Sequence, residues 1–262
     1  MKKYLALMFI LISSFGFSQT SIKDTKEVDY VDLSVNLIDD QKMDKDVTSI
    51  IETLRNSTAD GLNAQLTDDK KKLAFWVNIY NGYIQYILSK NPELYEDRRN
   101  FFSMERIDIA GKTLSFASIE HGIIRHSQFQ FFMGYLTNPF PSSFEKMLRV
   151  EERDWRIHFA LNCGAKSCPP VATYHPETLD YEFDYMTKEY LKEQTVYGSG
   201  EKLANTVTLF SWFRGDFGGP DGIRDILVDY DVVSERPKRV KLTSYDWTLD
   251  LGNYREIPDQ RL

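Results

Sequence analysis

Apolar side chains recur at helical spacing in several stretches of the chain, and the strongest pattern covers residues 68–89. Asp68 or Asp69 can cap a helix there, and the helix should end before Pro92, because the residue preceding a proline disfavours helical backbone. Apolar side chains cover almost every side of this helix, so we expect it to be central and buried. The same spacing predicts shorter helices at residues 44–55, 119–126, 143–148, 177–194 and 222–228.

Alternation of apolar and polar positions predicts strands at three other places. Residues 106–116 alternate around a central Gly-Lys pair, which predicts a hairpin. Residues 156–161 predict a strand that ends in the loop at 162–170. Residues 240–246 predict a closing strand.

Together these elements predict the fold class and the extent of the domain. The chain has no repeat and no linker long enough to divide it. We therefore expect one compact α+β domain over residues 44–262, with helices packed around a small, mostly antiparallel sheet and a central buried helix. Residues 19–43 are polar and contain few aromatic side chains, so we expect an N-terminal arm that packs late or loosely.

The first 18 residues have the three-part layout of a secretory signal peptide. Lys2 and Lys3 precede a short apolar run, and small side chains at Gly16 and Ser18 suit cleavage before Gln19. The run is shorter than the ~18 residues that a membrane span needs, and no other stretch of the chain reaches that length. We expect a bacterial protein that is periplasmic or secreted, without a membrane span.

Composition narrows the class of protein further. Hydrophobic residues make up 42% of the chain and aromatic residues 14%, which excludes disordered and fibrous classes. The formal net charge is -7, and it becomes -9 without the two lysines of the predicted signal. Nucleic acid is therefore not an expected partner, because its phosphates would be repelled. We expect no cofactor, and the oligomeric state stays open.

Three amides form a narrow stripe on the predicted central helix, because Asn78, Asn81 and Gln85 are spaced by three and four residues. Their neighbours are aromatic, and buried amides must be hydrogen-bonded. The stripe can clamp a neighbouring loop, or it can line a ligand pocket. Both interpretations stay open at this point.

A second group of polar residues lies in the short helix predicted after Ser118, which can serve as its N-cap. His121 and Arg125 share a face of this helix, and Glu120 lies about 100° around the helix from His121. A carboxylate beside an imidazole can orient it as a general base. The alternative is a surface ion cluster at a helix start, which the spacing alone favours.

The two cysteines, Cys163 and Cys168, lie in the loop after the predicted strand at 156–161. In an oxidising compartment the simplest expectation is a disulfide between them. The alternative is that Cys163 is a reactive thiolate, with His121 or His158 as its base. Strict alternation along the strand places His158 and Cys163 on opposite faces, so the chain must bend if the two are to meet.

Zinc binding is a third interpretation of this segment. It offers four potential ligands: His158, Cys163, Cys168 and His175. The four-residue spacer between the cysteines is wider than in most structural zinc sites, and export favours a disulfide. We therefore expect no metal.

Five motifs occur together in the chain. They are Phe-Trp-Val-Asn-Ile-Tyr-Asn at 75–81, Ser-Ile-Glu-His-Gly-Ile-Ile-Arg at 118–125, the block from Arg156 to Pro170 that contains Asn-Cys-Gly-Ala-Lys-Ser-Cys-Pro-Pro, Leu-Phe-Ser-Trp-Phe-Arg-Gly-Asp-Phe at 209–217 and Tyr-Asp-Trp at 245–247. With them the chain resembles the domain-of-unknown-function 547 family, from about residue 70 to residue 250. The family has no established activity, so the resemblance implies a domain and not a reaction. It draws attention to Asn78, Asn81, Glu120, His121, Arg125, His158, Asn162, Cys163 and Cys168.

The first functional hypothesis is a thiol-dependent hydrolase or acyl transferase that acts on amide bonds. Cys163 would be the nucleophile and His121 or His158 the base. Glu120, or an amide such as Asn78, would orient the base. The substrate would be bound by Asn78, Asn81, Arg125 and Asn162.

The second hypothesis is a non-catalytic module. Cys163 and Cys168 then form a structural disulfide, and the polar side chains hold loops or bind a small-molecule or peptide ligand. The redox state of the cysteines separates the two hypotheses, because a complete disulfide removes the resting nucleophile.

Overall fold

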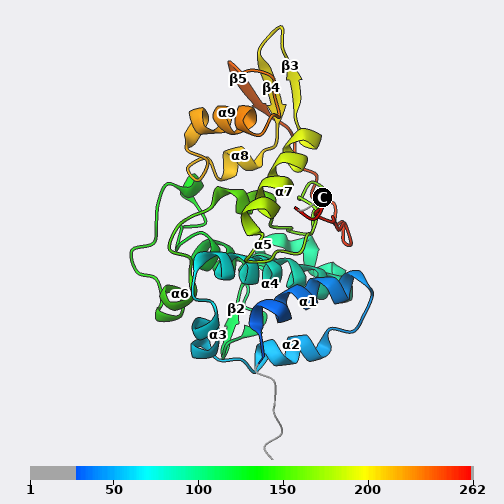
Figure 1. The fold of residues 1–262 in the computed structure, drawn as a ribbon, viewed down its shortest axis with the longest axis vertical. Helices are drawn as coiled ribbons and strands as arrows, with labels where there is room; N and C mark the ends of the chain where they lie inside the picture. The colour runs from blue at the N-terminus through cyan, green and yellow to red at the C-terminus, as the bar shows by residue number, and fades with distance from the viewer. Residues whose placement is uncertain (1–27, 261–262) are drawn as a thin grey trace, which may run out of the picture.

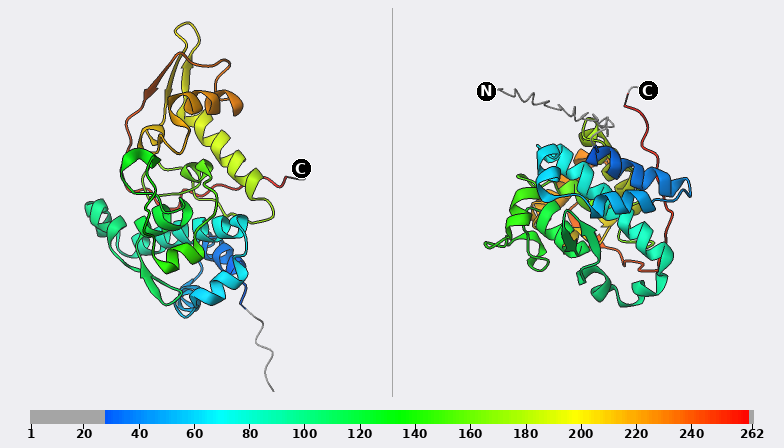
Figure 2. Two further views of the ribbon diagram at one scale, coloured as in Figure 1. Left: turned by 90° about the vertical axis from the view of Figure 1, so that its left-hand side faces the viewer. Right: turned by 90° about the horizontal axis from the view of Figure 1, so that it is seen from below.

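The computed structural model describes residues 28–260 and shows an α+β fold, as predicted (Figure 1). A helical body with α1 to α6 lies at one end of the molecule, and a small sheet with α8 and α9 lies at the other (Figure 2). Each end has its own cluster of buried apolar side chains, and Tyr245 packs against both clusters. The predicted signal peptide, residues 1–18, lies outside the described residues.

The centre of the helical body is α4 (Asp69–Lys90), which confirms the predicted buried helix. The side chain of Asp68 caps it by accepting a hydrogen bond from the backbone N–H of Lys71 at 3.0 Å. Nearly every side chain from Lys72 to Gln85 is buried. A helix with so little solvent contact is held by packing on all sides and not by one amphipathic face.

Residues 30–42 are where the prediction of a loosely packed arm is wrong. They form α1 (Tyr30–Lys42), capped by Asp29, and α1 packs along α4 with Leu37 and Ile38 fully buried. The two helices approach closely at Gly82, where a Cβ would lie only 2.6 Å from the Leu37 side chain. The polar composition of the segment concealed this contact, because three or four apolar residues suffice to bury one side of a short helix.

Shorter helices complete the helical body. They are α2 (Thr48–Arg55), α3 (Ala59–Gln65), the 3-10 helix η1 (Pro92–Asp97), α5 (Arg98–Ser103), the 3-10 turn η3 (Phe132–Gly134) and α6 (Ser143–Leu148). The helices predicted at 44–55 and 143–148 are therefore confirmed. Within residues 28–260, no helix combines the length and the apolar character that crossing a membrane requires.

The predicted hairpin is confirmed as β1 (Ile107–Ile109) and β2 (Lys112–Leu114), which pair antiparallel. Ala110 and Gly111 connect the strands, and both have positive φ, at 54° and 71°. Two residues in the left-handed region give the tight turn whose twist matches a hairpin.

The other end of the molecule holds a three-stranded sheet. Its strands are β3 (Val196–Gly198), β4 (Leu203–Thr206) and β5 (Arg239–Leu242), and its helices are α7 (Leu179–Gln194), α8 (Leu209–Trp212) and α9 (Gly219–Asp229). β3 and β4 pair antiparallel, whereas the predicted closing strand β5 pairs parallel to β4. The helices predicted at 177–194 and 222–228 correspond to α7 and α9.

After β5 the chain returns to the helical body as an extended segment, residues 245–255, which we call the strap (Figure 1). It is held by isolated bridges from Leu249 to Ala165 and from Tyr254 to Val171. The amide of Gln85 in α4 accepts a hydrogen bond from the Gly252 N–H at 2.9 Å. The strap therefore links the two ends of the molecule.

Residues 156–161 do not form the predicted strand. They belong to a 3-10 helix, η4 (Trp155–Phe159), which Asp154 caps through the Arg156 N–H at 2.9 Å. The apolar alternation has another cause: Ile157 packs into the cluster of the helical body and Phe159 into the cluster of the other end. In a 3-10 helix residues i and i+2 point about 120° apart. Two cores on different sides of such a helix therefore give apolar residues at the same spacing as one buried face of a strand.

Candidate functional site

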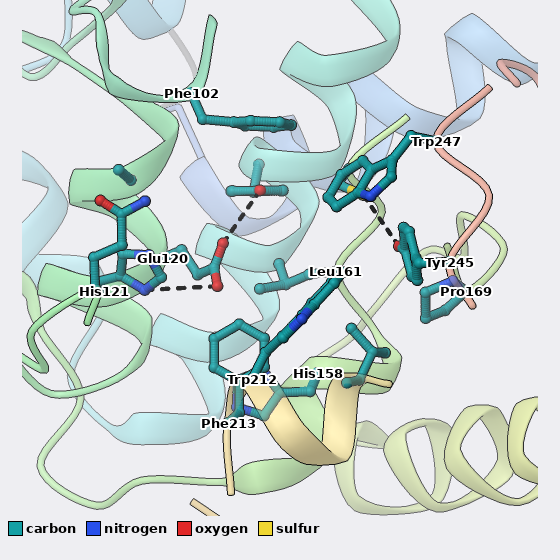
Figure 3. Close-up of a pocket in the computed structure, with 15 residues that line it drawn as sticks. Phe102, Glu120, His121, His158, Leu161, Pro169, Trp212, Phe213, Tyr245 and Trp247 are labelled. Atoms are coloured by element: carbon teal, nitrogen blue, oxygen red, sulfur yellow. Dashed lines mark hydrogen bonds and ion pairs between the residues drawn. The ribbon is translucent and has the colours of Figure 1, made fainter. Parts of the chain in front are cut away.

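A cavity of about 300 Å³ lies where α4, α8, the strap and the π-helix η2 (Ser118–Ile124) meet (Figure 3). This volume is within the range of small-molecule sites. Its wall is largely aromatic, from Tyr80, Phe102, Trp212, Phe213, Tyr245 and Trp247. Its polar lining comes from Glu120, His121, Gln130, His158 and Cys163. The four residues predicted as catalytic thus line one cavity, although they come from distant segments.

A second hollow, of about 480 Å³, is lined mostly by charged side chains. These charges already pair with one another, since Arg156 contacts Asp154 at 2.6 Å and Asp180 at 2.8 Å. Charged side chains that already pair with one another have few free hydrogen-bonding groups left to bind a ligand. The aromatic cavity is therefore the better candidate site.

The π-helix brings Glu120 and His121 to the same wall. Its hydrogen bonds span five residues, from the Arg125 N–H to the Glu120 carbonyl at 2.9 Å and from the Ser127 N–H to the Gly122 carbonyl at 2.8 Å. Ser118 is not the N-cap that we predicted, because the helix already begins at residue 116. The hydroxyl oxygen of Ser115 accepts a hydrogen bond from the Ser118 N–H instead. Such wide turns often occur at functional sites.

Glu120 directs its carboxylate into the cavity (Figure 3). The hydroxyl of Tyr80 donates to Glu120 Oε2 at 3.3 Å. The other oxygen, Oε1, lies 3.6 Å from His121 Nδ1. Within residues 28–260 no donor lies within hydrogen-bond distance of Oε1, so this oxygen can accept a hydrogen bond from a ligand or face a positive charge.

His121 is a neutral imidazole with a fixed tautomer. Arg125 Nη1 lies 2.8 Å from His121 Nδ1, and because a guanidinium can only donate, Nδ1 must accept and the proton must lie on Nε2. Burial lowers the pKa of His121; the negative charge of Glu120 opposes this effect, and the positive charge of Arg125 adds to it. His121 therefore does not form a full ion pair with Glu120, despite their proximity.

Asp216 lies behind the cavity and organises these groups. Its Oδ2 accepts from Arg125 Nε and from His158 Nε2, both at 2.8 Å, and its Oδ1 accepts from Arg153 at 3.2 Å. Burial would raise the pKa of Asp216, but the hydrogen bonds from His158 and Arg125 outweigh burial and lower its pKa to about 2. The carboxylate is therefore charged and fixes the guanidinium that sets the tautomer of His121.

His158 contacts the cavity with its ring but has little freedom as a base. It is stacked on Phe213 with ring centroids 3.8 Å apart, and its Nε2 proton is used by Asp216. Burial lowers its pKa, although the hydrogen bond to Asp216 opposes that effect. Because residues 155–159 form a 3-10 helix, His158 and Cys163 lie on the same side of the segment, contrary to the alternation argument.

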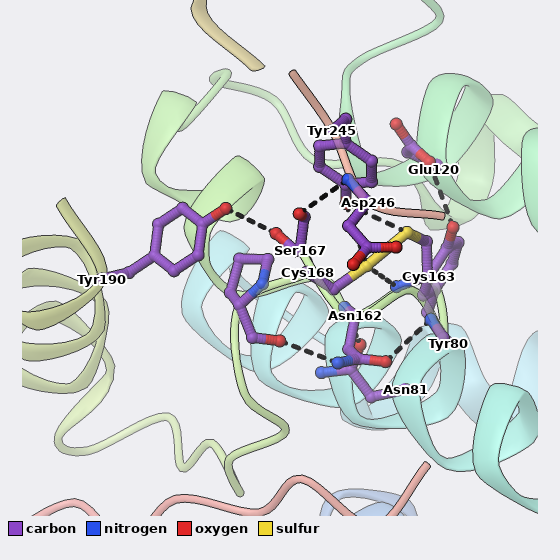
Figure 4. Close-up of a disulfide and its surroundings, with 12 residues drawn as sticks. Tyr80, Asn81, Glu120, Asn162, Cys163, Ser167, Cys168, Tyr190, Tyr245 and Asp246 are labelled. Atoms are coloured by element: carbon purple, nitrogen blue, oxygen red, sulfur yellow. Dashed lines mark hydrogen bonds between the residues drawn. A yellow bond between two sulfur atoms is a disulfide. The ribbon is translucent and has the colours of Figure 1, made fainter. Parts of the chain in front are cut away.

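Cys163 and Cys168 form a disulfide that contributes to the wall of the cavity (Figure 4). The hydroxyl of Tyr245 lies 3.3 Å from the sulfur of Cys163 and 3.1 Å from that of Cys168. In this state Cys163 has no free thiolate, so it is not a resting nucleophile. The zinc alternative also lacks support, because His175 is paired with Glu182 and the described part of the chain has no cluster of three metal-binding side chains.

The disulfide loop is held by amides that were candidates for substrate binding. Asn81 donates to the Ala160 carbonyl at 2.9 Å and accepts from the Asn162 N–H at 2.7 Å. Asn162 in turn donates to the Pro169 carbonyl and accepts from the Gly164 N–H (Figure 4). Gly164 has a φ of +82°, which a side chain would strain.

Asn78 and Arg125 also lie outside the cavity. Asn78 bonds both backbone groups of Tyr174, at 2.8 and 3.0 Å, and is fully buried. Arg125 is 2% exposed and points toward Asp216 and His121. The structure places Asn78, Asn81 and Asn162 as clamps and Arg125 as a positioning residue. None of the four side chains predicted to bind substrate lines the cavity.

Two histidines should influence the pH dependence of stability in opposite directions. Burial lowers the pKa of His121, so its contribution to stability is present above the unfolded value of about 6.5 and is lost as the pH falls below it. The hydrogen bond with Glu182 raises the pKa of His175, so its contribution is present below about 6.5 and is lost as the pH rises through the folded value.

We therefore expect two glutamine variants to change the acid response in opposite ways. Between about pH 7.5 and pH 5, His121→Gln should lose less thermal stability than the unmodified chain, and His175→Gln should lose more. Thermal unfolding at several pH values measures both slopes. Equal slopes in the two variants would contradict the assignment.

Residues 64–191 match the family described as "Protein of unknown function, DUF547". This part of the chain belongs to the DUF547 family. The matched segment supplies Glu120, His121, His158 and Cys163 to the cavity, whereas Trp212, Phe213, Tyr245 and Trp247 lie beyond it. No curated protein and no solved structure matches the chain.

Asp216, behind the cavity and beyond the segment that matches DUF547, is a functional residue that the sequence alone did not reveal. It lies in Asp-Phe-Gly-Gly, which has the composition of a turn. A signal was present, because Asp216 lies in the aromatic stretch at 210–217, where Phe210 and Phe217 are buried, and a carboxylate buried among such rings needs a partner. Nothing in the local pattern identifies that partner as Arg125 or His158.

Proposed function

We propose that this chain is an exported, non-catalytic module that binds a small organic ligand in the aromatic cavity. The observation that carries the proposal is the composition of the cavity wall, which is largely apolar with a few convergent polar groups. Small-molecule sites have this composition, because apolar surface supplies affinity while a few fixed polar groups supply orientation. The proposal that the chain is exported is supported by the signal-like layout of residues 1–18.

The rigidity of the wall also supports binding. The disulfide, the clamps of Asn81 and Asn162 and the ion pair of Arg125 with Asp216 fix the surrounding loops before any ligand arrives. A preformed site loses less conformational entropy when it binds, so more of the contact energy appears as affinity.

Binding can be tested with a variant that fills the cavity. Ala117 lines it, and Ala117→Trp should abolish the binding of small aromatic fragments detected by saturation-transfer NMR. Ala64→Trp is the matched control, because Ala64 is exposed in α3 and does not line the cavity. Fragments that bind the unmodified chain and both variants equally would show that the cavity is not the binding site.

A thiol-dependent hydrolase or acyl transferase remains the second candidate. The observation that favours it is that the sulfur of Cys163 lines the same cavity as Glu120 and His121. This function needs the disulfide to be reduced, since only a thiolate attacks a carbonyl. Thiol titration of the protein used for the fragment experiment separates the candidates: a complete disulfide supports the binding module, whereas two free thiols favour the enzyme.

A further inference from the structure

The charges that face the cavity are unbalanced. Glu120 is the one acidic side chain among the described residues that line it, and that set includes no lysine or arginine. The two lining histidines, His121 and His158, have pKa values lowered by burial. The positive charge of Arg125, behind the wall, is paired with Asp216 at 2.8 Å. A ligand in the cavity therefore meets a negative charge at Glu120.

The wall opposite Glu120 consists of aromatic rings. In Figure 3 the rings of Tyr245 and Trp247 lie across the cavity from the Glu120 side chain. Trp212, Tyr245 and Trp247 form a cluster with ring centroids 4.6 to 5.5 Å apart. The faces of aromatic rings carry negative potential and attract cations, tryptophan most strongly.

Two arginines of the chain already make cation–π contacts with rings of this wall. The guanidinium of Arg98 lies 5.2 Å from the centroid of the Trp247 ring, and that of Arg125 lies 4.7 Å from the centroid of Phe213. Both contacts are within the distance at which cation–π attraction is appreciable. A cation inside the cavity would meet rings of the same kind and would also face Glu120.

We propose that the cavity binds a methylated ammonium group, with Glu120 as its counter-charge and the rings of Trp212, Tyr245 and Trp247 as its walls. A primary ammonium has three N–H donors, each of which needs an acceptor once it is removed from water. The aromatic side of the cavity offers few acceptors, whereas a quaternary ammonium donates no hydrogen bonds and needs only ring faces and a negative charge. The inference rests on the proposed binding function and names its ligand class.

The test compares three probes of similar size. Choline carries the quaternary ammonium, 3,3-dimethylbutan-1-ol is its uncharged isostere, and ethanolamine carries a primary ammonium. Titrations followed by tryptophan fluorescence and by calorimetry should show choline binding roughly tenfold or more tightly than the isostere. Ethanolamine should bind more weakly than choline.

Two variants assign the preference to the cavity. Glu120→Gln should remove most of the advantage of choline over the isostere, because the amide keeps the size of the side chain but not its charge. Asp246→Asn is the matched control, because it removes one negative charge from the exposed part of the strap and not from the cavity lining, so the advantage of choline should persist.

The outcomes separate this inference from the proposed function. Equal binding of choline and its isostere, or tighter binding of ethanolamine, overturns the inference while ligand binding by the cavity stands. Failure of all three probes to bind also overturns it, and the fragment experiment with Ala117→Trp then decides the proposed function independently. The comparison of probes needs only the unmodified chain, so it remains decisive even if a variant does not fold.

Discussion

Replacing Asp216 with asparagine is expected to lower the free energy of unfolding by about 3–5 kcal/mol. The side chain of Asp216 is only 4% exposed, and it neutralises Arg125, whose side chain is 2% exposed. The amide keeps the shape of the carboxylate but removes its charge, so the guanidinium remains buried without a counter-ion. Urea denaturation measures the loss, which for a domain of this size corresponds to a fall of roughly 10 °C in Tm.

The control for this variant is Asp221→Asn. Asp221 also contacts arginines, at 3.0 Å from both Arg224 and Arg236, but its side chain is 78% exposed. Exposed ion pairs contribute about 0–1 kcal/mol to stability, so this change should leave the free energy of unfolding nearly unchanged. If the two variants lose similar stability, the ion pair behind the cavity does not have the structural role given to it here.

The second large effect is expected for Asn81→Leu, which should cost about 2–5 kcal/mol of unfolding free energy. Leucine has a similar volume but cannot pair with the Ala160 carbonyl or the Asn162 N–H. Both backbone groups would then be buried without partners, because the surrounding side chains are buried as well. The loop that carries the disulfide should also exchange its amide hydrogens faster.

An exposed asparagine provides the comparison for Asn81. Asn63 lies on the surface of α3, and Asn63→Leu should change stability by no more than about 0.5 kcal/mol. Hydrogen exchange of the loop at 162–169 should be the same as in the unmodified chain. A loss in Asn81→Leu no larger than that in Asn63→Leu would show that Asn81 is not a clamp.

The parts of the fold that the sequence predicted are those determined by local chemistry. The helix at α4 has a capping aspartate, a continuous apolar stretch and an Asn-Pro stop, all within 25 residues of one another. The hairpin has a glycine at its turn. The strand predicted at 156–161 failed because its alternation arises from two separate cores, and a single segment contains no information about how many cores surround it.

The candidate site was predictable to a similar degree. The hydrolase hypothesis required Cys163 to lie near Glu120 and near either His121 or His158, and all four residues line one cavity. The roles of the amides could not be fixed in advance, because Asn81 and Asn162 find their partners only when α4 meets the disulfide loop. The aromatic wall was missed for the same reason, since Trp212 and Trp247 are far apart in sequence and stack only through the course of the strap.

The cavity is assembled from two stretches of chain that lie far apart in the sequence. The acid, the imidazoles and the disulfide come from the segment that matches the family, and most of the aromatic wall comes from residues 212–247, beyond that segment. The two stretches are joined by Asp216, which lies in the later stretch and pairs with Arg125 and His158 of the matched segment. Substitutions of the aromatic residues around Asp216 can alter the wall of the cavity while this ionic contact stays in place. Over evolutionary time the aromatic residues of the later stretch can therefore vary more freely than Asp216, whose loss would leave Arg125 buried without a counter-ion.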